Sequence, residues 1–406
     1  MATRPILHVA IPAMNERAFI PYTLECLQRQ TYKTFKIWVC VNQPENWWSL
    51  HEKLRICHDN LSTIEYLTSL RFENLNIIDH SSPGKGWKGN DHGVGQARKV
   101  IMDNIIRSAN QNDIIVSLDA DTTFNDDYLS CIVQVFERFP EAIGLSNPYY
   151  HKLTDDETLN RAILRYEIYM RYYTLNLWRI GSPYSFTALG SAISIPVWAY
   201  RKIGGMSAKK SGEDFYLLQK LRKSGWVANH NTSIVFPATR YSNRVFFGTG
   251  PALIKGSQGD WNSYPIYHWR FFDQIHQTYL LFPELFQKKV ETPMSGFLNN
   301  HFGEEEIFER LRQNCRDIGR FVNACHQKVD GLRVLQFLKH SHGLNQGNDE
   351  VNLLGFLHKF YPGFFDNFDK SLQATLSFKH SDIKLLDQIR NFLMEKERHF
   401  QESDNP

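Results

Sequence analysis

The first half of the chain alternates short apolar runs with longer stretches in which apolar residues recur every three to four positions. Short β-branched runs predict strands buried on both faces, and the longer period predicts amphipathic helices. Apolar runs at 6–11 and 36–41 flank an amphipathic stretch at 17–29, which predicts a βαβ opening. The same pattern predicts further strands at 75–78, 113–118, 143–146, 187–195 and 233–236, and helices at 95–108, 126–138 and 156–180.

From about residue 304 the chain changes to helical periodicity with charged faces. This pattern predicts helices at 304–329, 332–340, 353–361 and 383–400. We therefore expect an α/β domain over 1–290, built on an open, mainly parallel sheet flanked by helices. A helical accessory domain is expected over 291–406.

Composition narrows the class of protein. A chain of 406 residues with 42% hydrophobic residues is long enough and apolar enough for a sizeable core. The net charge of +3 and the lack of a Lys/Arg block imply neither nucleic acid nor an anionic membrane as partner. No apolar run reaches the ~18 residues of a membrane span, and the N-terminal run is too short for a signal peptide. Six scattered cysteines without a C-x-x-C pair suggest neither a zinc site nor a disulfide framework, so we expect a cytoplasmic enzyme with at most peripheral membrane contact.

Two acidic residues, Asp119 and Asp121, directly follow the apolar run at 113–118. In open α/β sheets the carboxyl ends of the strands are where ligands bind. Two alternating carboxylates there can offer hard oxygen ligands to Mg²⁺ or Mn²⁺. An isolated Asp-x-Asp also fits an ordinary strand end, so the other motifs must decide between the two interpretations.

The first predicted strand runs into Pro12-Ala13-Met14-Asn15-Glu16, a turn without glycine. A nicotinamide-binding fold needs G-x-G-x-x-G at this place, so that the backbone can approach a pyrophosphate. Its absence counts against a dehydrogenase. Asn15 and Glu16 either cap the following helix or face the same crevice as Asp119.

A second acidic pair, Glu213-Asp214, follows a Gly204-Gly205-Met206 turn. Ser211 to Asp214 fits the S-x-x-[DE] capping box, in which an acid in the first helical turn satisfies free amides. The alternative is a carboxylate that takes part in chemistry. Both alternatives remain open on this segment alone.

Four motifs in this order resemble the family 2 glycosyltransferases of the GT-A fold. They are Pro12-Ala13-Met14-Asn15-Glu16, the glycine-bearing segment 85–98, Asp119-Ala120-Asp121 after a strand, and the G-G-[FM] and E-D-x-x-L pair at 204–218. The resemblance covers about residues 5–250. It implies a GT-A type open, mixed, mainly parallel sheet flanked by helices, and Asp214 as catalytic base with Glu213 beside it.

The chemistry of sugar transfer gives independent reasons for these residue types. The leaving diphosphate must be neutralised, which Mn²⁺ or Mg²⁺ held by Asp121 can do, with Asp119 near the ribose and the metal. The acceptor hydroxyl must lose a proton, which Asp214 can accept from the far side of the anomeric carbon. The result is one in-line displacement with inversion.

The resemblance also implies a nucleotide site. Lys85, Asp91 and Arg98 would line the nucleotide, although a flexible surface loop is an alternative for 83–98. After the second strand the family usually carries an acidic residue that binds the base, whereas this chain has Asn42. An amide can still pair with a uracil edge.

Two arginines, Arg240 and Arg244, stand beside a glycine-bearing hinge after the predicted strand at 233–236. They could fold over the diphosphate and close the site, or make surface ion pairs. The predicted donor site contains these two residues together with Pro12, Asn15, Glu16, Asn42, Lys85, Asp91, Arg98 and Asp119.

The leading hypothesis is an inverting, metal-dependent glycosyltransferase that moves a sugar from a nucleotide-sugar donor to a glycan or lipid-linked acceptor. UDP is favoured as the nucleotide by analogy only. A nucleotidyltransferase, which would release pyrophosphate, is expected to carry a G-x-G-T-R-like loop that Pro12-Ala13-Met14 does not supply. A catalytically silent nucleotide-sugar or glycan-binding subunit is the third alternative.

Overall fold

The computed structural model describes residues 4–89, 92–209, 212–243, 248–367 and 376–404. Its contacts group the chain into two compact units. Unit 1 comprises Met1–Ile163, Phe186–Gln258 and Gln401–Pro406, and unit 2 comprises Leu164–Ser185 and Gly259–Phe400. The predicted domain boundary near residue 290 stays a prediction.

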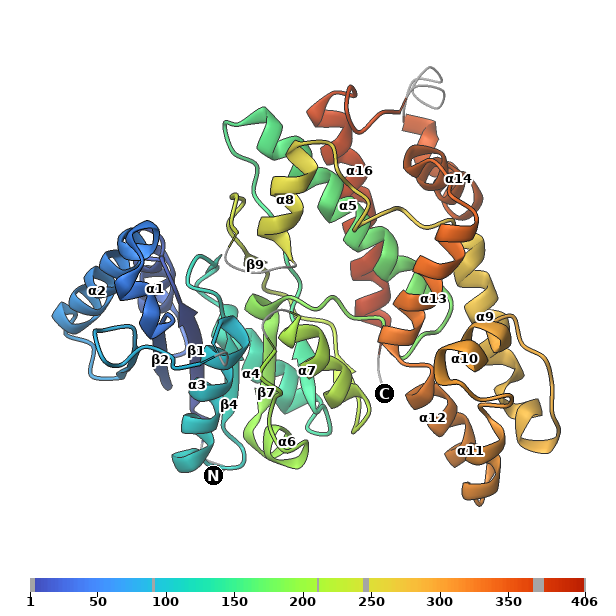
Figure 1. Cartoon of the computed structure of the whole chain (residues 1–406), viewed down its shortest axis with the longest axis horizontal. Helices are drawn as coiled ribbons and strands as arrows, with labels where there is room; N and C mark the ends of the chain where they lie inside the picture. The colour runs from blue at the N-terminus through green and yellow to red at the C-terminus, as the bar shows by residue number, and fades with distance from the viewer. Residues whose placement is uncertain (1–3, 90–91, 210–211, 244–247, 368–375, 405–406) are drawn as a thin grey trace. The chain divides into compact units, whose positions relative to one another are not determined.

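Unit 1 is built on a seven-stranded sheet with the strand order β3-β2-β1-β4-β7-β6-β8 within the described residues. Figure 1 labels β2, β1, β4 and β7 of this sheet. Strands β1 to β4 pair in parallel, β7 runs antiparallel to β4 and β6, and β6 pairs in parallel with β8. Strands β5 and β9 form a separate two-stranded sheet. The strands are β1 Leu7–Ala13, β2 Phe35–Asn42, β3 Leu75–His80, β4 Ile114–Ser117, β5 Thr123–Phe124, β6 Gly144–Ser146, β7 Ile193–Pro196, β8 Val227–Ala228 and β9 Val235–Phe236.

The core of the sheet explains why its apolar runs were visible in the sequence. All seven positions of β1 and all four of β4 are buried, as expected for parallel strands covered on both faces. The parallel register pairs Ala13 with Val41 of β2, and Ala10 with Ser117 of β4. The segments that follow β1, β2 and β4 therefore leave the sheet at one common edge.

Helices flank this sheet and make up nearly all of the regular structure of unit 2 (Figure 1). The helices are α1 Ile20–Arg29, α2 Leu54–Ser69, α3 Val94–Ser108, α4 Tyr128–Arg138, α5 Glu157–Arg179, α6 Val197–Lys202, α7 Glu213–Arg222, α8 Thr249–Ser257, α9 Trp269–Gln287, α10 Ser295–Phe302, α11 Glu309–Asn314, α12 Ile318–Lys328, α13 Gly331–Leu344, α14 Asp349–Phe360 and α16 Ile383–Ser403. The predicted mixed, mainly parallel sheet with flanking helices and a helical C-terminal region is confirmed. Across the ranges given above, no helix combines the length and the apolar character needed to cross a membrane.

Three predictions of local structure were wrong or incomplete. The strand expected at 187–195 begins only at Ile193, because residues 190–192 form a 3₁₀ turn. The single helix expected at 304–329 is interrupted: Asp317 is extended and its side chain accepts a hydrogen bond from Arg320 N, so it caps α12 instead of continuing α11. The set of predicted helices was incomplete, because it lacked α2, α6, α8, α9 and α10.

Buried ion pairs join two helices of unit 2. Glu167 and Arg171 of α5 pair with each other at 2.6 Å, and Arg171 Nη1 donates to Glu397 Oε2 of α16 at 2.5 Å. Arg390 of α16 lies 3.6 Å from Glu167 Oε2. Because a buried charge is tolerated only when it is paired, these contacts favour one alignment of α5 against α16.

Candidate active site

The turn after β1 has an unusual backbone. Asn15 has φ +58°, and among the described residues no other non-glycine residue has a positive φ. Asparagine tolerates this left-handed conformation better than most residues. The turn is held from α2, where the Asn60 side chain accepts a hydrogen bond from Asn15 N at 2.8 Å. The carboxylate of the next residue, Glu16, is buried at the edge of the sheet.

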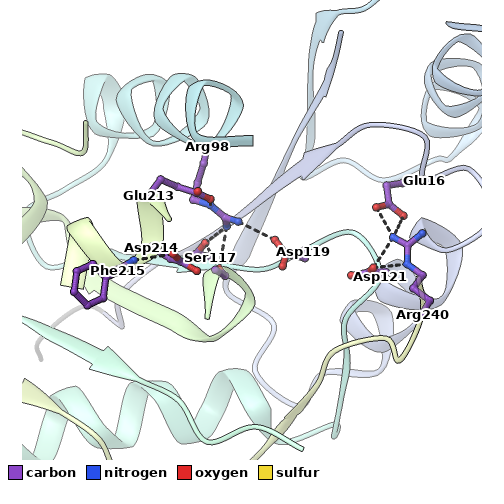
Figure 2. A network of polar contacts seen from close by, with 10 residues as sticks. Glu16, Arg98, Ser117, Asp119, Asp121, Glu213, Asp214, Phe215 and Arg240 are labelled. Atoms are coloured by element: carbon purple, nitrogen blue, oxygen red, sulfur yellow. Dashed lines mark hydrogen bonds and ion pairs between the residues drawn. The ribbon is translucent and has the colours of Figure 1, made fainter. Parts of the chain in front are cut away.

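Arg240 joins Glu16 to Asp121 (Figure 2). Its Nε donates to Asp121 Oδ2 at 2.7 Å, and its Nη2 donates to the two Glu16 oxygens at 2.6 and 2.8 Å. The guanidinium also lies over the ring of Phe19, 4.0 Å from its centroid. Burial raises the pKa of Asp121, while the positive charge of Arg240 acts in the opposite direction. The predicted metal ligand Asp121 is thus paired with an arginine from the segment after β9.

Arg98 forms a second group of contacts from α3 (Figure 2). Its Nη2 donates to Asp119 Oδ1 at 2.8 Å, its Nε donates to Glu213 Oε1 at 3.4 Å, and its Nη1 donates to Gly190 O at 2.9 Å and to Ser117 Oγ. The arginine side chain is only 1% exposed, whereas that of Asp119 is 40% exposed. All three guanidinium nitrogens therefore bond to protein atoms, and Arg98 links the predicted metal site to the acidic pair on α7.

Gly190 makes room for this arginine. A Cβ at position 190 would lie 2.5 Å from Arg98 Nη2. We expect Gly190→Ala to lower the free energy of unfolding by about 1–3 kcal/mol, because the buried guanidinium could move away only by weakening its hydrogen bonds. Urea unfolding checks this value. Gly296→Ala is the matched control, because Gly296 lies in α10 and a Cβ there would meet no atom within 4 Å, so the change should be neutral or slightly stabilising; equal losses in both variants would contradict the close contact.

Asp214 lies in the first turn of α7, beside Glu213. The helix follows Gly212, which has φ +72° and serves as the N-cap. The capping-box alternative placed the cap one residue earlier, at Ser211, which lies outside the described residues. Asp214 Oδ1 instead accepts a hydrogen bond from the amide of Phe215 at 2.7 Å.

The electrostatic surroundings of Asp214 favour its protonated form. Burial, and next the negative charge of Glu213, raise the pKa of Asp214 to about 7, although Arg98 acts in the opposite direction. Asp119 is near enough for its charge to contribute to the same rise. Burial also raises the pKa of Glu213, against the attraction of Arg98. A carboxyl group that titrates near neutral pH is suited to accept a proton in catalysis.

The residues predicted to hold the nucleotide differ from one another in burial and in hydrogen-bond partners. Asn42 is buried, and its amide donates to Ala13 O at 3.0 Å and accepts from Trp87 Nε1 at 3.3 Å. Lys85 is exposed and pairs with Asp79 Oδ2 at 3.0 Å. Pro12 lies inside β1 with its side chain buried. Asp91 and Arg244 lie outside the described residues.

The two carboxylates of the Asp-x-Asp motif match the needs of a divalent cation that arrives with a diphosphate. Mg²⁺ is commonly held by one or two protein carboxylates, with water and phosphate oxygens completing the shell. Asp119 and Asp121 supply such oxygens, and Asp119 is open to solvent. Where side chains are described, no group of three or more His, Cys, Asp or Glu residues forms an all-protein metal site. Asp119 and Asp121 fit the one or two protein carboxylates that Mg²⁺ takes when water and phosphate oxygens complete its shell.

Several residues of this site were missed in the sequence. Ser117 and Gly190 bind Arg98, Asn60 holds the turn at Asn15, and Phe19 lies under Arg240. They are small, polar or aromatic residues without a motif of their own. One signal was available in the sequence: Ser117 lies two residues before Asp119, and alternate residues of an extended chain face the same side.

Residues 114–277 match the family model described as "Glycosyl transferase family group 2". The matched segment contains Asp119, Asp121, Glu213, Asp214 and Arg240. No curated protein matches the sequence.

Two of the solved structures that are similar to this chain are complexes with a nucleotide sugar. S. aureus TarS 1-349 in complex with UDP-GlcNAc is 12% identical, with 98% of this chain and 90% of that chain covered, at a TM-score of 0.39. The mannosyltransferase PcManGT from Pyrobaculum calidifontis in complex with GDP-Man and Mn²⁺ is 14% identical, with 96% and 88% covered, at a TM-score of 0.38. The match to the family model over residues 114–277 confirms the resemblance to family 2 glycosyltransferases found in the sequence, and the chain is a glycosyltransferase.

Proposed function

We propose that this glycosyltransferase moves a sugar from a nucleotide-sugar donor to a hydroxyl group of a glycan or lipid-linked acceptor, with inversion at the anomeric carbon. The donor nucleotide is UDP by analogy with the family. The reaction depends on a divalent cation, Mn²⁺ or Mg²⁺.

On the donor side, Asp121 and Asp119 would hold the cation, which supplies positive charge against the leaving diphosphate. Glu16 and Arg240 adjoin Asp121, so a diphosphate there meets a guanidinium as well as carboxylates. Arg98 holds the Asp119 carboxylate in place, because the buried guanidinium donates a hydrogen bond to it at 2.8 Å. We assign Arg98 to positioning rather than to direct contact with the donor.

On the acceptor side, Asp214 takes the proton of the attacking hydroxyl group. Glu213 is a poorer candidate, since it is 5% exposed and directed at Arg98. The observation that carries the proposal is the set of contacts made by Arg98, which bonds both to Asp119 and to Glu213, the neighbour of Asp214. Burial and the charge of Glu213 also raise the pKa of Asp214 to about 7, which suits a base. One in-line displacement requires a single base on the side of the anomeric carbon opposite to the leaving diphosphate, and we assign that role to Asp214.

A donor panel tests the proposal. The full chain is incubated with UDP- and GDP-sugars and Mn²⁺, and the nucleotide products are separated by chromatography. Water serves as acceptor where none is known, and proton NMR follows the first anomer of the released sugar. We expect a nucleoside diphosphate and a sugar of inverted configuration, at a rate that falls with EDTA.

Other products would indicate other functions. Release of pyrophosphate from a nucleoside triphosphate and a sugar phosphate would point to a nucleotidyltransferase. Tight binding of nucleotide sugars without turnover across the panel would point to a binding subunit. A retained anomeric configuration would exclude the single displacement at Asp214.

A further inference from the structure

Arg240 binds the carboxylate that the proposed function assigns to the metal. Its Nε and Nη2 both donate to Asp121 Oδ2, while Nη2 also reaches both oxygens of Glu16 (Figure 2). The Arg240 side chain is 18% exposed, those of Glu16 and Asp121 are 2% and 12% exposed, and the guanidinium rests on the ring of Phe19. The side chains of Glu16 and Asp121 thus hold one guanidinium cation between two largely buried carboxylates.

A divalent cation and this guanidinium cannot share Asp121 without cost. A metal ion bound to the same carboxylate would lie within a few ångströms of the arginine charge, in a region where little water screens the repulsion. A carboxylate oxygen that accepts two guanidinium hydrogen bonds also has less capacity left for a metal. Breaking the hydrogen bonds between Arg240 and Asp121 therefore makes the free energy of metal binding less favourable.

We propose that Arg240 and the divalent cation are alternative partners of Asp121, so that the metal binds by displacing the guanidinium. This inference rests on the proposed function, which places the cation at Asp121. Glu16 and Phe19 retain the displaced side chain beside the site, where its planar donors fit a phosphate group. Donor and metal then bind together: the diphosphate receives the arginine that the metal has displaced.

A lysine substitution can distinguish displacement of Arg240 by the metal from simple charge repulsion at a distance. Lysine at position 240 keeps the charge, but it lacks the rigid fork that bridges Glu16 and Asp121. If contact is what matters, Arg240→Lys weakens the competition. If only the charge matters, Arg240→Lys behaves like the wild-type protein.

Mn²⁺ binding to the donor-free full chain tests the exchange. Free Mn²⁺ is followed by electron paramagnetic resonance in the wild-type protein, Arg240→Gln, Arg240→Lys and the control Arg29→Gln. Arg29 is an exposed arginine of unit 1 that pairs with Glu25 and Asp126, so its removal changes the net charge equally, without touching Asp121. We expect Mn²⁺ to bind Arg240→Gln about tenfold more tightly or better, the scale of one charge-assisted hydrogen bond, with Arg240→Lys in between and Arg29→Gln unchanged.

Three outcomes would overturn the exchange. They are equal or weaker Mn²⁺ binding in Arg240→Gln, equal binding in Arg240→Lys and the wild-type protein, and no Mn²⁺ binding in any of the four proteins. Melting temperatures confirm that each variant is folded. The donor panel reports on sugar transfer independently of this titration, so a failed exchange and a failed function give different results.

Discussion

Replacing Asp214 with asparagine is expected to lower the turnover number for sugar transfer by about 10²- to 10⁴-fold, the usual contribution of a general base. Asparagine has the same shape, and its carbonyl oxygen can still accept the hydrogen bond from Phe215 N. The start of α7 is thereby preserved, and donor binding should change little. Steady-state kinetics and donor titration separate these two effects.

The control for this variant is Asp126→Asn. Asp126 is an exposed carboxylate of unit 1 that pairs with Arg29, and its loss should leave turnover unchanged. Turnover above about a tenth of the wild-type value in Asp214→Asn, in a protein that still binds the donor, would mean that another group takes the proton.

The pH profile of the wild-type enzyme gives a second measure of the same base. A carboxyl group with a pKa of about 7 must lose its proton before it can act, so kcat/KM should rise with pH through about 7 and then level off. Asp214→Asn should lack this rise. Glu213→Gln should shift the rise to lower pH, because the charge of Glu213 contributes to the raised pKa of Asp214. An unchanged profile in Glu213→Gln would contradict the coupling of the two acids.

The sheet could be predicted because burial on both faces leaves a clear mark on the sequence. β1 and β4 are mainly apolar runs with every position buried, and their ends were placed within two residues. Helix α2 left no such mark: its buried positions are Cys57, Asn60, Thr63 and Leu67, two of which are polar. Both polar side chains make hydrogen bonds rather than apolar contacts: Asn60 bonds to Asn15 N and Gln43, and the Thr63 hydroxyl donates to Asp59 O.

The candidate site divides in the same way. The acids at 119, 121, 213 and 214 stand in short motifs, so the sequence alone could propose them. Their partners are determined by the fold: Arg98 reaches Glu213, 115 residues away in sequence, and Arg240 reaches Glu16, 224 residues away. A short sequence motif cannot indicate ion pairs between residues that lie so far apart in the chain. The sequence therefore suggested Arg98 as a donor contact, whereas the structure surrounds it with Ser117, Asp119, Gly190 and Glu213.

Removal of Arg98 is expected to have the largest effect on stability. Arg98→Met keeps much of the side-chain volume but leaves Glu213, at 5% exposure, without the guanidinium that offsets its charge. An uncompensated buried charge of this kind costs about 3–5 kcal/mol. Urea unfolding at pH 8 should show this loss. Arg29→Met is the matched control, because Arg29 makes solvent-exposed ion pairs that water and salt screen, so its loss should change stability little.

The pH dependence of this loss identifies its cause. In Arg98→Met the Glu213 carboxyl retains the burial that raises its pKa and loses the opposing attraction of Arg98, so the folded protein holds that proton more tightly than the unfolded chain does. Stability falls with rising pH wherever the folded state binds more protons. The variant should therefore be closest to the wild-type protein near pH 5 and furthest from it at pH 8, and adding Glu213→Gln should recover part of the loss at pH 8. A loss that is the same at both pH values, and that Glu213→Gln does not relieve, would mean that Arg98 stabilises the site through packing and its contacts with Ser117 and Gly190, rather than by balancing the charge of Glu213.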